Sequence, residues 1–368
     1  MRAAFLTLVI LLPALAQGQH LSPDQLFSRA TQEQQKGDLE AAIRDYRSVL
    51  ALRPENLAAR VNLGAALAHS GQLDAAIAEY QAALKLAPQL ESVHLDLGLA
   101  YSRKNDLADA REQYTAAHRA NPSDVRVAIL LGDAEARTGK ATDAVAMLTL
   151  METGNAGNSD FEYVLGEALI AGGHPRDGAA RVEKSAAMTN SAESWMLAGS
   201  TLLRLNEFTQ ARHDLDNAVK LDPSIPGLCT LAGTARDKDG DATAAEPAFR
   251  QALQQNPNDF EANLYLGAIL YKMRNMDEAK MYLDKALELN PKSTLARYEF
   301  GMWESTSGQY EAAAKELESV TADDPQWLEP HVELATLYYR LHRPDDGKRE
   351  RAIVDKLTAE QQQQGPGK

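Results

Sequence analysis

The sequence predicts an all-α chain, a right-handed α-solenoid of about ten stacked helix–turn–helix repeats. Three observations predict it: glycines recur about every 34 residues, a small residue follows each glycine after twelve positions, and prolines keep the same period in most repeats. A fixed period of this length indicates one helical hairpin per repeat, because each hairpin buries its apolar face only against its neighbours. The repeating glycines are Gly64, Gly98, Gly132, Gly166, Gly199, Gly233, Gly267 and Gly301.

The first sixteen residues have the layout of a secretory signal peptide. Met1 and Arg2 form a short positive region, an apolar run from Ala3 to Leu12 follows, and Ala14 and Ala16 provide the small residues that a signal peptidase requires. We therefore expect cleavage after Ala16 and export of the protein to a periplasm or to the medium. An uncleaved membrane anchor is the alternative, although the run is shorter than the roughly 20 apolar residues that cross a bilayer. After cleavage, no membrane span is expected.

Each repeat from position 21 to position 355 is expected to form two helices. In the second repeat the first helix starts at Leu57 and ends before Gly71, which provides the left-handed residue that often follows a helix. The second helix starts near Asp74, and Pro88 stops it. The glycine and the small residue are expected where the two helices cross. Bulky side chains of the second helix are expected to fill the gap to the neighbouring repeat: Tyr46, Tyr80, Tyr114, Phe249, Leu283 and Leu317.

The repeats are less regular between positions 147 and 190. The fourth repeat has Ala156 in place of its proline, and the fifth has Gly178, Val182 and Asn190 at the alanine, aromatic and proline positions. We expect the weakest packing there, with lower protection from hydrogen exchange. Positions 356–368 are read as a C-terminal tail, whose end from Gln361 has the low-complexity sequence QQQQGPGK typical of disorder.

Composition excludes several classes of function. The 38 Lys and Arg against 52 Asp and Glu give a formal charge of −14, which argues against a nucleic-acid partner. The single cysteine excludes a disulfide framework and any zinc site that needs two thiolates. No cofactor is expected.

These residues resemble the tetratricopeptide repeat family, whose pattern pairs Leu-Gly in the first helix with alanine, an aromatic residue and a closing proline in the second. In the second repeat the matching residues are Leu63, Gly64, Ala76, Tyr80 and Pro88. Most members of this family are peptide-binding scaffolds and assembly factors, so the resemblance implies a protein or peptide partner.

No catalytic motif survives inspection. The best metal candidate is a run of alternate aspartates, Asp237, Asp239 and Asp241, which resembles the first half of a calcium loop. The expected Gly and Glu of that loop are Ala242 and Ala248, so an inter-helix turn is the favoured interpretation. We expect no enzyme activity.

In the family, the first helices line a concave surface, and the resemblance implies that two rows of side chains lie there. The position three before each glycine is apolar in nine of ten repeats, the exception being Thr230. These residues are Phe27, Val61, Leu95, Ile129, Tyr163, Met196, Leu264, Tyr298 and Val332. The position five after the glycine is often basic, in Arg103, Arg137, Arg204, Lys238, Lys272 and Arg340.

An apolar row beside a cationic row is typical of a groove for an extended peptide with acidic groups. Packing between helices, and basic residues favoured at helix C-termini, explain the same pattern without a ligand. The predicted function is an exported, non-catalytic scaffold for protein–protein interaction. The alternative is a periplasmic assembly or chaperone factor for envelope machinery such as pili, secretion, polysaccharide export or cytochrome maturation.

Overall fold

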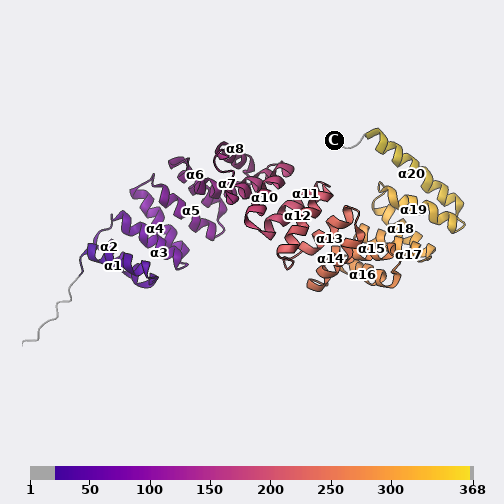
Figure 1. Cartoon of the computed structure of the whole chain (residues 1–368), viewed down its shortest axis with the longest axis horizontal. Coiled ribbons are helices and arrows are strands. Elements are labelled where there is room, and N and C mark those ends of the chain that lie inside the picture. The colour runs from indigo at the N-terminus through magenta and orange to yellow at the C-terminus, as the bar shows by residue number, and fades with distance from the viewer. Residues whose placement is uncertain (1–20, 365–368) are drawn as a thin grey trace, which may run out of the picture. The chain divides into compact units, whose positions relative to one another are not determined.

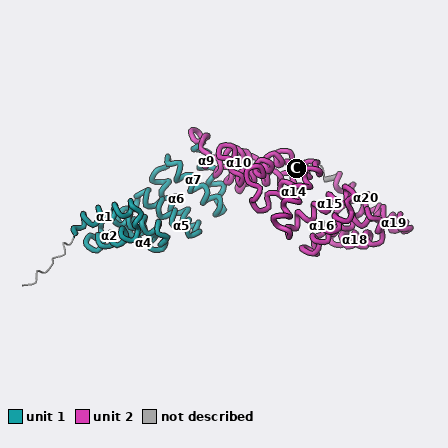
Figure 2. Tube along the Cα trace, turned by 60° about the horizontal axis from the view of Figure 1, so that its bottom comes forward, with its two compact units in different colours: residues 1–151 teal, residues 152–368 magenta. Residues whose placement is uncertain are grey.

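The computed structural model describes residues 21–364, which form twenty α-helices and no strand (Figure 1). The predicted all-α repeat fold is confirmed. The predicted signal peptide, 1–16, lies outside the described residues. The chain divides between Met151 and Glu152 into two compact units, unit 1 before this point and unit 2 after it (Figure 2).

Unit 1 contains eight helices among its described residues. They are α1 (Pro23–Gln35), α2 (Leu39–Leu52), α3 (Leu57–His69), α4 (Leu73–Leu86), α5 (Glu91–Arg103), α6 (Leu107–Ala120), α7 (Val125–Arg137) and α8 (Ala141–Met151). Odd-numbered helices are the first helices of the repeats, and even-numbered helices are the second. Consecutive helices pack on one another, and α3 also contacts both α1 and α5.

Unit 2 follows the same plan over its described residues. Its helices are α9 (Ser159–Ala171), α10 (Pro175–Thr189), α11 (Ala192–Arg204), α12 (Phe208–Leu221), α13 (Leu228–Lys238), α14 (Ala242–Gln255), α15 (Phe260–Lys272), α16 (Met276–Leu289), α17 (Thr294–Thr306), α18 (Tyr310–Asp323), α19 (Leu328–Arg340) and α20 (Pro344–Gln364). The first helices α11, α13, α15 and α17 touch in succession. Each unit therefore presents a face made of adjoining first helices.

The helix ends follow local sequence signals. Asn56 accepts a hydrogen bond from the backbone N–H of Ala59 and caps α3, and Ser293 caps α17 in the same way. The residue seven after each repeat glycine has a positive φ in every repeat, with +81° at Gly71 and 63° at Asn105. The predicted left-handed ends of the first helices are thus confirmed. Arg274 and His342 adopt the same conformation, which is unusual for arginine.

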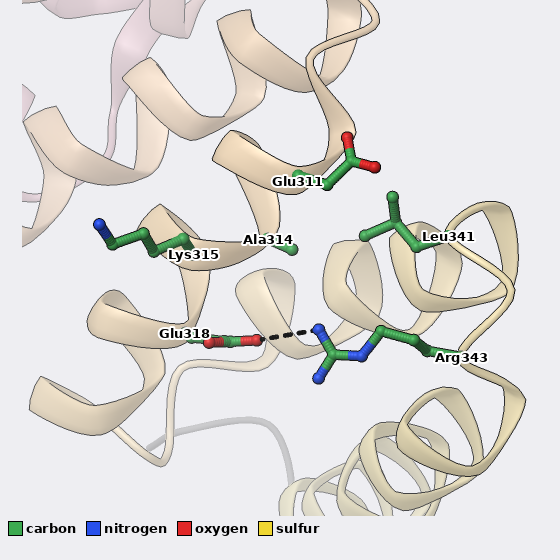
Figure 3. A pocket seen from close by; sticks show the side chains of 6 residues that line it. All are labelled: Glu311, Ala314, Lys315, Glu318, Leu341 and Arg343. Atoms are coloured by element: carbon green, nitrogen blue, oxygen red, sulfur yellow. Dashed lines mark ion pairs between the residues drawn. The ribbon is translucent and has the colours of Figure 1, made fainter.

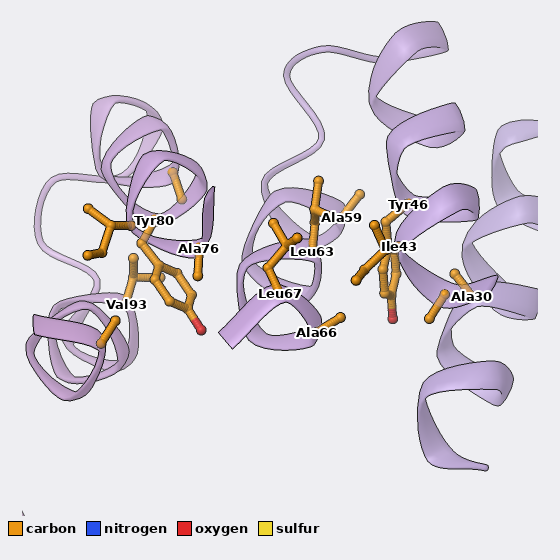
Figure 4. Packing of buried hydrophobic residues seen from close by; sticks show 14 of the residues in the cluster. Ala30, Ile43, Tyr46, Ala59, Leu63, Ala66, Leu67, Ala76, Tyr80 and Val93 are labelled. Atoms are coloured by element: carbon orange, nitrogen blue, oxygen red, sulfur yellow. The ribbon is translucent and has the colours of Figure 1, made fainter. Parts of the chain in front are cut away.

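The core lies between the two helices of each repeat. A Cβ placed on Gly64 would lie 2.6 Å from Cε1 of Tyr80, whose side chain is 2% exposed (Figure 4). The glycine is therefore required by the close approach of this ring. The bulky Tyr80 of the second helix lies against the glycine of its own repeat and also beside Asp96 and Leu99 of the next repeat, the side that the sequence predicted.

The fifth repeat has the closest helix pair. A Cβ on Gly178 would lie 2.6 Å from the carbonyl oxygen of Gly166, so the two backbones almost touch. Glu162, fully buried on α9, accepts hydrogen bonds from Arg181 at 3.1 Å and Lys184 at 2.5 Å on α10. The irregular repeat is compact within its own hairpin, and its lower protection from hydrogen exchange stays a prediction.

The C-terminal helix is longer than expected. Helix α20 continues beyond the predicted boundary at 355 and includes Gln361–Gln364, which had been predicted to be disordered. Glutamine is a fair helix former and no Gly or Pro interrupts the segment before Gly365, so a helix that is already established can extend through it. Among the described residues, no helix combines the length and apolar composition that crossing a bilayer requires.

Candidate functional site: the first-helix face

The predicted site residues all lie on first helices, on the surface where successive first helices adjoin. We call this surface of each unit its first-helix face, defined by the positions three before and one, four and five after the repeat glycine. Unit 1 contains the predicted residues Phe27, Val61, Leu95, Ile129, Arg103 and Arg137. The other predicted residues belong to unit 2.

The apolar row is only partly available to a ligand. Seven of its nine side chains are half-buried, Leu264 is 1% exposed, and Val332 is 46% exposed. Phe27 packs edge-on against Tyr46 with ring centroids 5.8 Å apart. Most of the row therefore contributes to packing between helices as well as to the surface.

Tyr298 illustrates the environment of this row in unit 2. The centroid of its ring lies 4.6 Å from the centroid of the Trp327 ring. Burial, followed by the nearby carboxylates of Glu299, Glu329 and Glu333, raises the pKa of Tyr298 to about 12. Acidic side chains therefore accompany the apolar row here.

The cationic row consists of the last residue of six first helices, all of them exposed. A basic side chain at this place is favoured by the partial negative charge of the helix C-terminus. Arg103 donates to the carbonyl oxygen of Ala68 at 2.7 Å, and Arg137 pairs with Asp133 at 3.4 Å.

The remaining four basic residues differ in their contacts. Lys238, Lys272 and Arg340 lie over tyrosine rings at 5.9, 5.6 and 5.1 Å from the centroids. The side chain of Arg204 has no hydrogen bond or ion pair within the described part of the chain. The row thus combines structural contacts with exposed charge.

A pocket opens on the first-helix face of unit 1, between α3 and α5. Its volume is about 200 Å³. The residues that line it are Ala65, Ala68, His69, Tyr80, Asp96, Leu99, Ala100 and Arg103. The sequence analysis had identified only Arg103 among them. The signal that could have found the pocket is alanine at position 68, where the neighbouring repeats have Gln34 and Ser102.

A second hollow, of about 320 Å³, lies in unit 2 beside α18 and the turn between α19 and α20 (Figure 3). Arg343 faces Glu318 there at 3.7 Å, stacks over the ring of Tyr338 at 4.4 Å and hydrogen-bonds to Asp346. Glu318 and Arg343, two of the charged residues that line this hollow, therefore already have partners within the chain.

The aspartate run lies at the end of α13 and in the turn that follows it. Asp239 accepts hydrogen bonds from Thr209 at 2.7 Å and Arg212 at 3.2 Å, and Asp241 caps α14 and accepts from Arg212 at 3.0 Å. Within residues 21–364, no group of three acidic, histidine or cysteine side chains has the arrangement of a metal site.

Two buried carboxyl groups titrate far from their usual range. Burial raises the pKa of Asp214 to about 7, opposed by the hydrogen bond from His213 Nδ1 at 2.9 Å and reinforced by the nearby Glu183. Burial and the neighbouring Glu316 raise the pKa of Glu304 to about 7, opposed by Lys280. Each has a charged neighbour in the preceding repeat, Glu183 for Asp214 and Lys280 for Glu304.

Comparison with known proteins identifies the repeats. Two models described as tetratricopeptide repeat match residues 27–91, 95–157, 163–226 and 238–298. A stretch of 105 residues is 27% identical to anaphase-promoting complex subunit 3 of Schizosaccharomyces pombe, covering 28% of this chain and 16% of that protein. A stretch of 102 residues is 30% identical to the formate-dependent nitrite reductase complex bifunctional subunit of Haemophilus influenzae, covering 27% of each chain.

Among solved structures, the APC/C hetero-tetramer Cut9-Hcn1 aligns over 93% of this chain and 95% of its own, with 12% identity and a TM-score of 0.49. The chain spans about a sixth to a quarter of the length of the two relatives above.

Proposed function

Because the chain belongs to the tetratricopeptide repeat family, we propose that it is an exported, non-catalytic scaffold that holds other proteins or peptides on its first-helix faces. Proteins built from these repeats bind other proteins, and most of them have no catalytic role of their own. No cofactor and no nucleic acid enters the proposal.

The observation that carries it is the regular first-helix face of each unit. Six exposed basic side chains occur at one repeated position, beside an apolar row that is half-buried in seven of nine repeats. A row of adjoining helices lets one extended segment contact several repeats, and the contacts made in each repeat add to the affinity.

Export is supported by the charge and apolar pattern of positions 1–16. The test is expression of the full chain in its host, followed by fractionation and sequencing of the N-terminus of the purified protein. A chain that starts at Gln17 outside the cytoplasm supports export, and a chain that keeps Met1 inside the cell contradicts it.

Affinity capture tests the scaffold. The full chain is compared with a variant in which Arg103, Arg137 and Arg204 are each changed to Glu. The matched control changes Arg47, Arg119 and Lys220, exposed basic residues of second helices, to Glu. We expect the first variant to lose partners that the control retains. Partners lost equally by both variants would indicate an effect of net charge alone.

A role in assembling envelope machinery is the second candidate. The similarity to a formate-dependent nitrite reductase complex subunit favours it within the 102 matched residues. The identity of the captured partners distinguishes the two candidates, because an assembly factor is expected to capture unassembled subunits and to release them once the complex has formed.

A further inference from the structure

The pocket between α3 and α5 contains a tyrosine hydroxyl that has no hydrogen-bond partner among the described residues, unlike its equivalents in the neighbouring repeats. Tyr46 donates to Gln34 at 2.8 Å, and the hydroxyls of Tyr114 and Ser102 are 3.0 Å apart. In the second repeat, alanine occupies the place of Gln34 and Ser102.

The hydroxyl of Tyr80 therefore makes no hydrogen bond within residues 21–364, although the residue is only 2% exposed. In Figure 4 its oxygen lies at the end of the ring that points out of the cluster of apolar side chains. The hydroxyl oxygen itself is open to the pocket, so it can donate to or accept from a group that enters there.

Asp96 lines the same pocket from α5. Its carboxylate has no hydrogen-bond partner in the described part of the chain, and its side chain is half-buried. Burial raises the pKa of Asp96, and His69 at the end of α3 opposes this. A bound positive charge would stabilise the ionised carboxylate further.

The other walls are apolar, apart from His69 at the end of α3 and Arg103 at the rim. Ala65, Ala68, Leu99 and Ala100 provide apolar surface between the two helices. Arg103 at the rim is held by its hydrogen bond to the carbonyl oxygen of Ala68.

We propose that this pocket binds a primary ammonium group on an aliphatic stem, namely a lysine side chain of a partner protein. The proposal rests on the scaffold function and names the partner group that this face accepts. The ammonium donates to the carboxylate of Asp96 and to the hydroxyl of Tyr80, and the methylene stem lies along the alanines and Leu99.

The chemistry of the walls selects this group over others. A carboxylate would face Asp96, and like charges in a partly desolvated pocket repel. A neutral aliphatic chain would leave both the carboxylate and the hydroxyl unpaired. An ammonium has three donors and no acceptor, which matches a carboxylate beside a hydroxyl.

The probe for the test is n-butylammonium chloride, with n-butanol as its neutral counterpart and potassium chloride as the salt control. Binding to the full chain is followed by NMR on tyrosine rings labelled with carbon-13, and Tyr80→Phe identifies the signal of Tyr80. We expect a saturable shift of that signal with n-butylammonium and not with potassium chloride, and at least tenfold weaker binding of n-butanol.

Two variants test the two groups separately. Asp96→Asn is expected to weaken binding of n-butylammonium by about 10- to 100-fold, because it removes a charge-assisted hydrogen bond. Ala68→Ser is expected to give the Tyr80 hydroxyl the partner that Tyr114 has and to narrow the pocket, so it should also weaken binding. Asp133→Asn, another acidic residue of this face, is the matched control and should leave binding unchanged.

Equal binding of n-butanol and n-butylammonium, absence of saturable binding, or unchanged binding in Asp96→Asn would overturn the proposal. The result is independent of partner capture. If the full chain and Asp96→Asn capture the same partners and n-butylammonium does not bind, the scaffold function is supported and the pocket proposal is wrong. Binding of n-butylammonium with no captured partner would leave the pocket and remove the scaffold.

Discussion

In the fifth repeat, glycine is required at the helix crossing because a Cβ would collide with individual backbone atoms of the facing helix. A Cβ on Gly178 would meet the carbonyl oxygen of Gly166 at 2.6 Å and the backbone nitrogen of Ile170 at 2.8 Å. Backbone atoms cannot move aside without shifting a helix, so Gly178→Ala is expected to lower the free energy of unfolding by about 1–3 kcal/mol. Urea unfolding followed by circular dichroism measures this loss.

The control for this change is Gly157→Ala in the same unit. A Cβ there would meet nothing within 4 Å, and the residue does not have a positive φ. We expect a change within about 0.5 kcal/mol. If both variants lose the same stability, the close approach of α9 and α10 is not the cause.

Asp214 makes the stability of unit 2 depend on pH. Its pKa rises from 3.8 to about 7 on folding because the side chain is fully buried beside Glu183, with His213 opposing the rise. A raised folded pKa leaves stability intact below about pH 4 and removes it progressively up to about pH 7. Asp214→Asn is therefore expected to stabilise the protein at pH 8, by an amount on the order of 2 kcal/mol, and to have little effect at pH 4.

Urea unfolding at the two pH values tests this, with Asp277→Asn, an exposed position on α16, as the control. An Asp214→Asn effect of the same size at pH 4 and pH 8 would contradict the argument, because it would then come from packing instead of charge.

At the scale of the element, the residue four before the repeat glycine joins the first helix to the preceding loop in several repeats. In four repeats its side chain is hydrogen-bonded to the carbonyl oxygen of the proline that closes the preceding repeat. The four residues are Arg60 at 2.8 Å, His94 at 3.0 Å, Asn263 at 3.1 Å and His331 at 3.2 Å. Three of these also reach the second helix of their own repeat: Arg60 with Glu79, His94 with Gln113 and His331 with Glu350. The loop between repeats is thus fixed to the hairpin that follows it.

Asn263→Ala tests this connection. Asn263 is 2% exposed and its side-chain amide donates to the carbonyl oxygens of Pro257 and Asp259, so its removal leaves the Pro257 oxygen without this donor, while the Asp259 oxygen keeps the backbone N–H of residue 263. We expect a loss of about 1–3 kcal/mol in the free energy of unfolding. Asn258→Ala, an exposed position in the same loop, should cost much less. Thermal unfolding of both variants gives the comparison, and equal losses would show that the connection is not stabilising.

The sequence predicted the positions of the helices better than the side-chain contacts between them, and the reason is physical. Glycine, alanine and proline have few alternatives where backbones cross or helices stop, so their period located the helices and the left-handed residue at Gly71. The position four before the glycine is Arg60, His94, Asn263 or His331 in the repeats that make this connection, and these different side chains all reach the carbonyl oxygen of the preceding proline. A periodicity of residue types does not reveal such a connection.

The same reasoning applies to the candidate site. A row of basic residues was visible as a pattern, although Arg103 and Arg137 turn out to be held by Ala68 and Asp133. The pocket depends on something smaller, the absence of a hydrogen-bonding side chain at position 68. A single missing partner has no period and is seen only when the neighbouring tyrosine hydroxyls can be compared.

At the scale of the whole molecule, the chain consists of two compact units that meet in sequence at Met151 and Glu152. Stability in a repeat protein is nearly a sum of hairpin and nearest-neighbour contributions, so cooperativity extends only as far as those interfaces are strong. The boundary coincides with the segment that lacks the closing proline, where Gly154 has a φ of +104°.

We therefore expect two unfolding transitions, each belonging to one unit. Gly64→Ala places a Cβ 2.6 Å from the ring of Tyr80 in unit 1, and Gly178→Ala places one against the backbone of Gly166 in unit 2. Each variant should lower one transition and leave the other in place, because distant sites contribute additively. Differential scanning calorimetry of the two variants and of the double variant separates the transitions. A single transition that both substitutions lower would show that cooperativity crosses the boundary, and the chain would then unfold as one array of repeats.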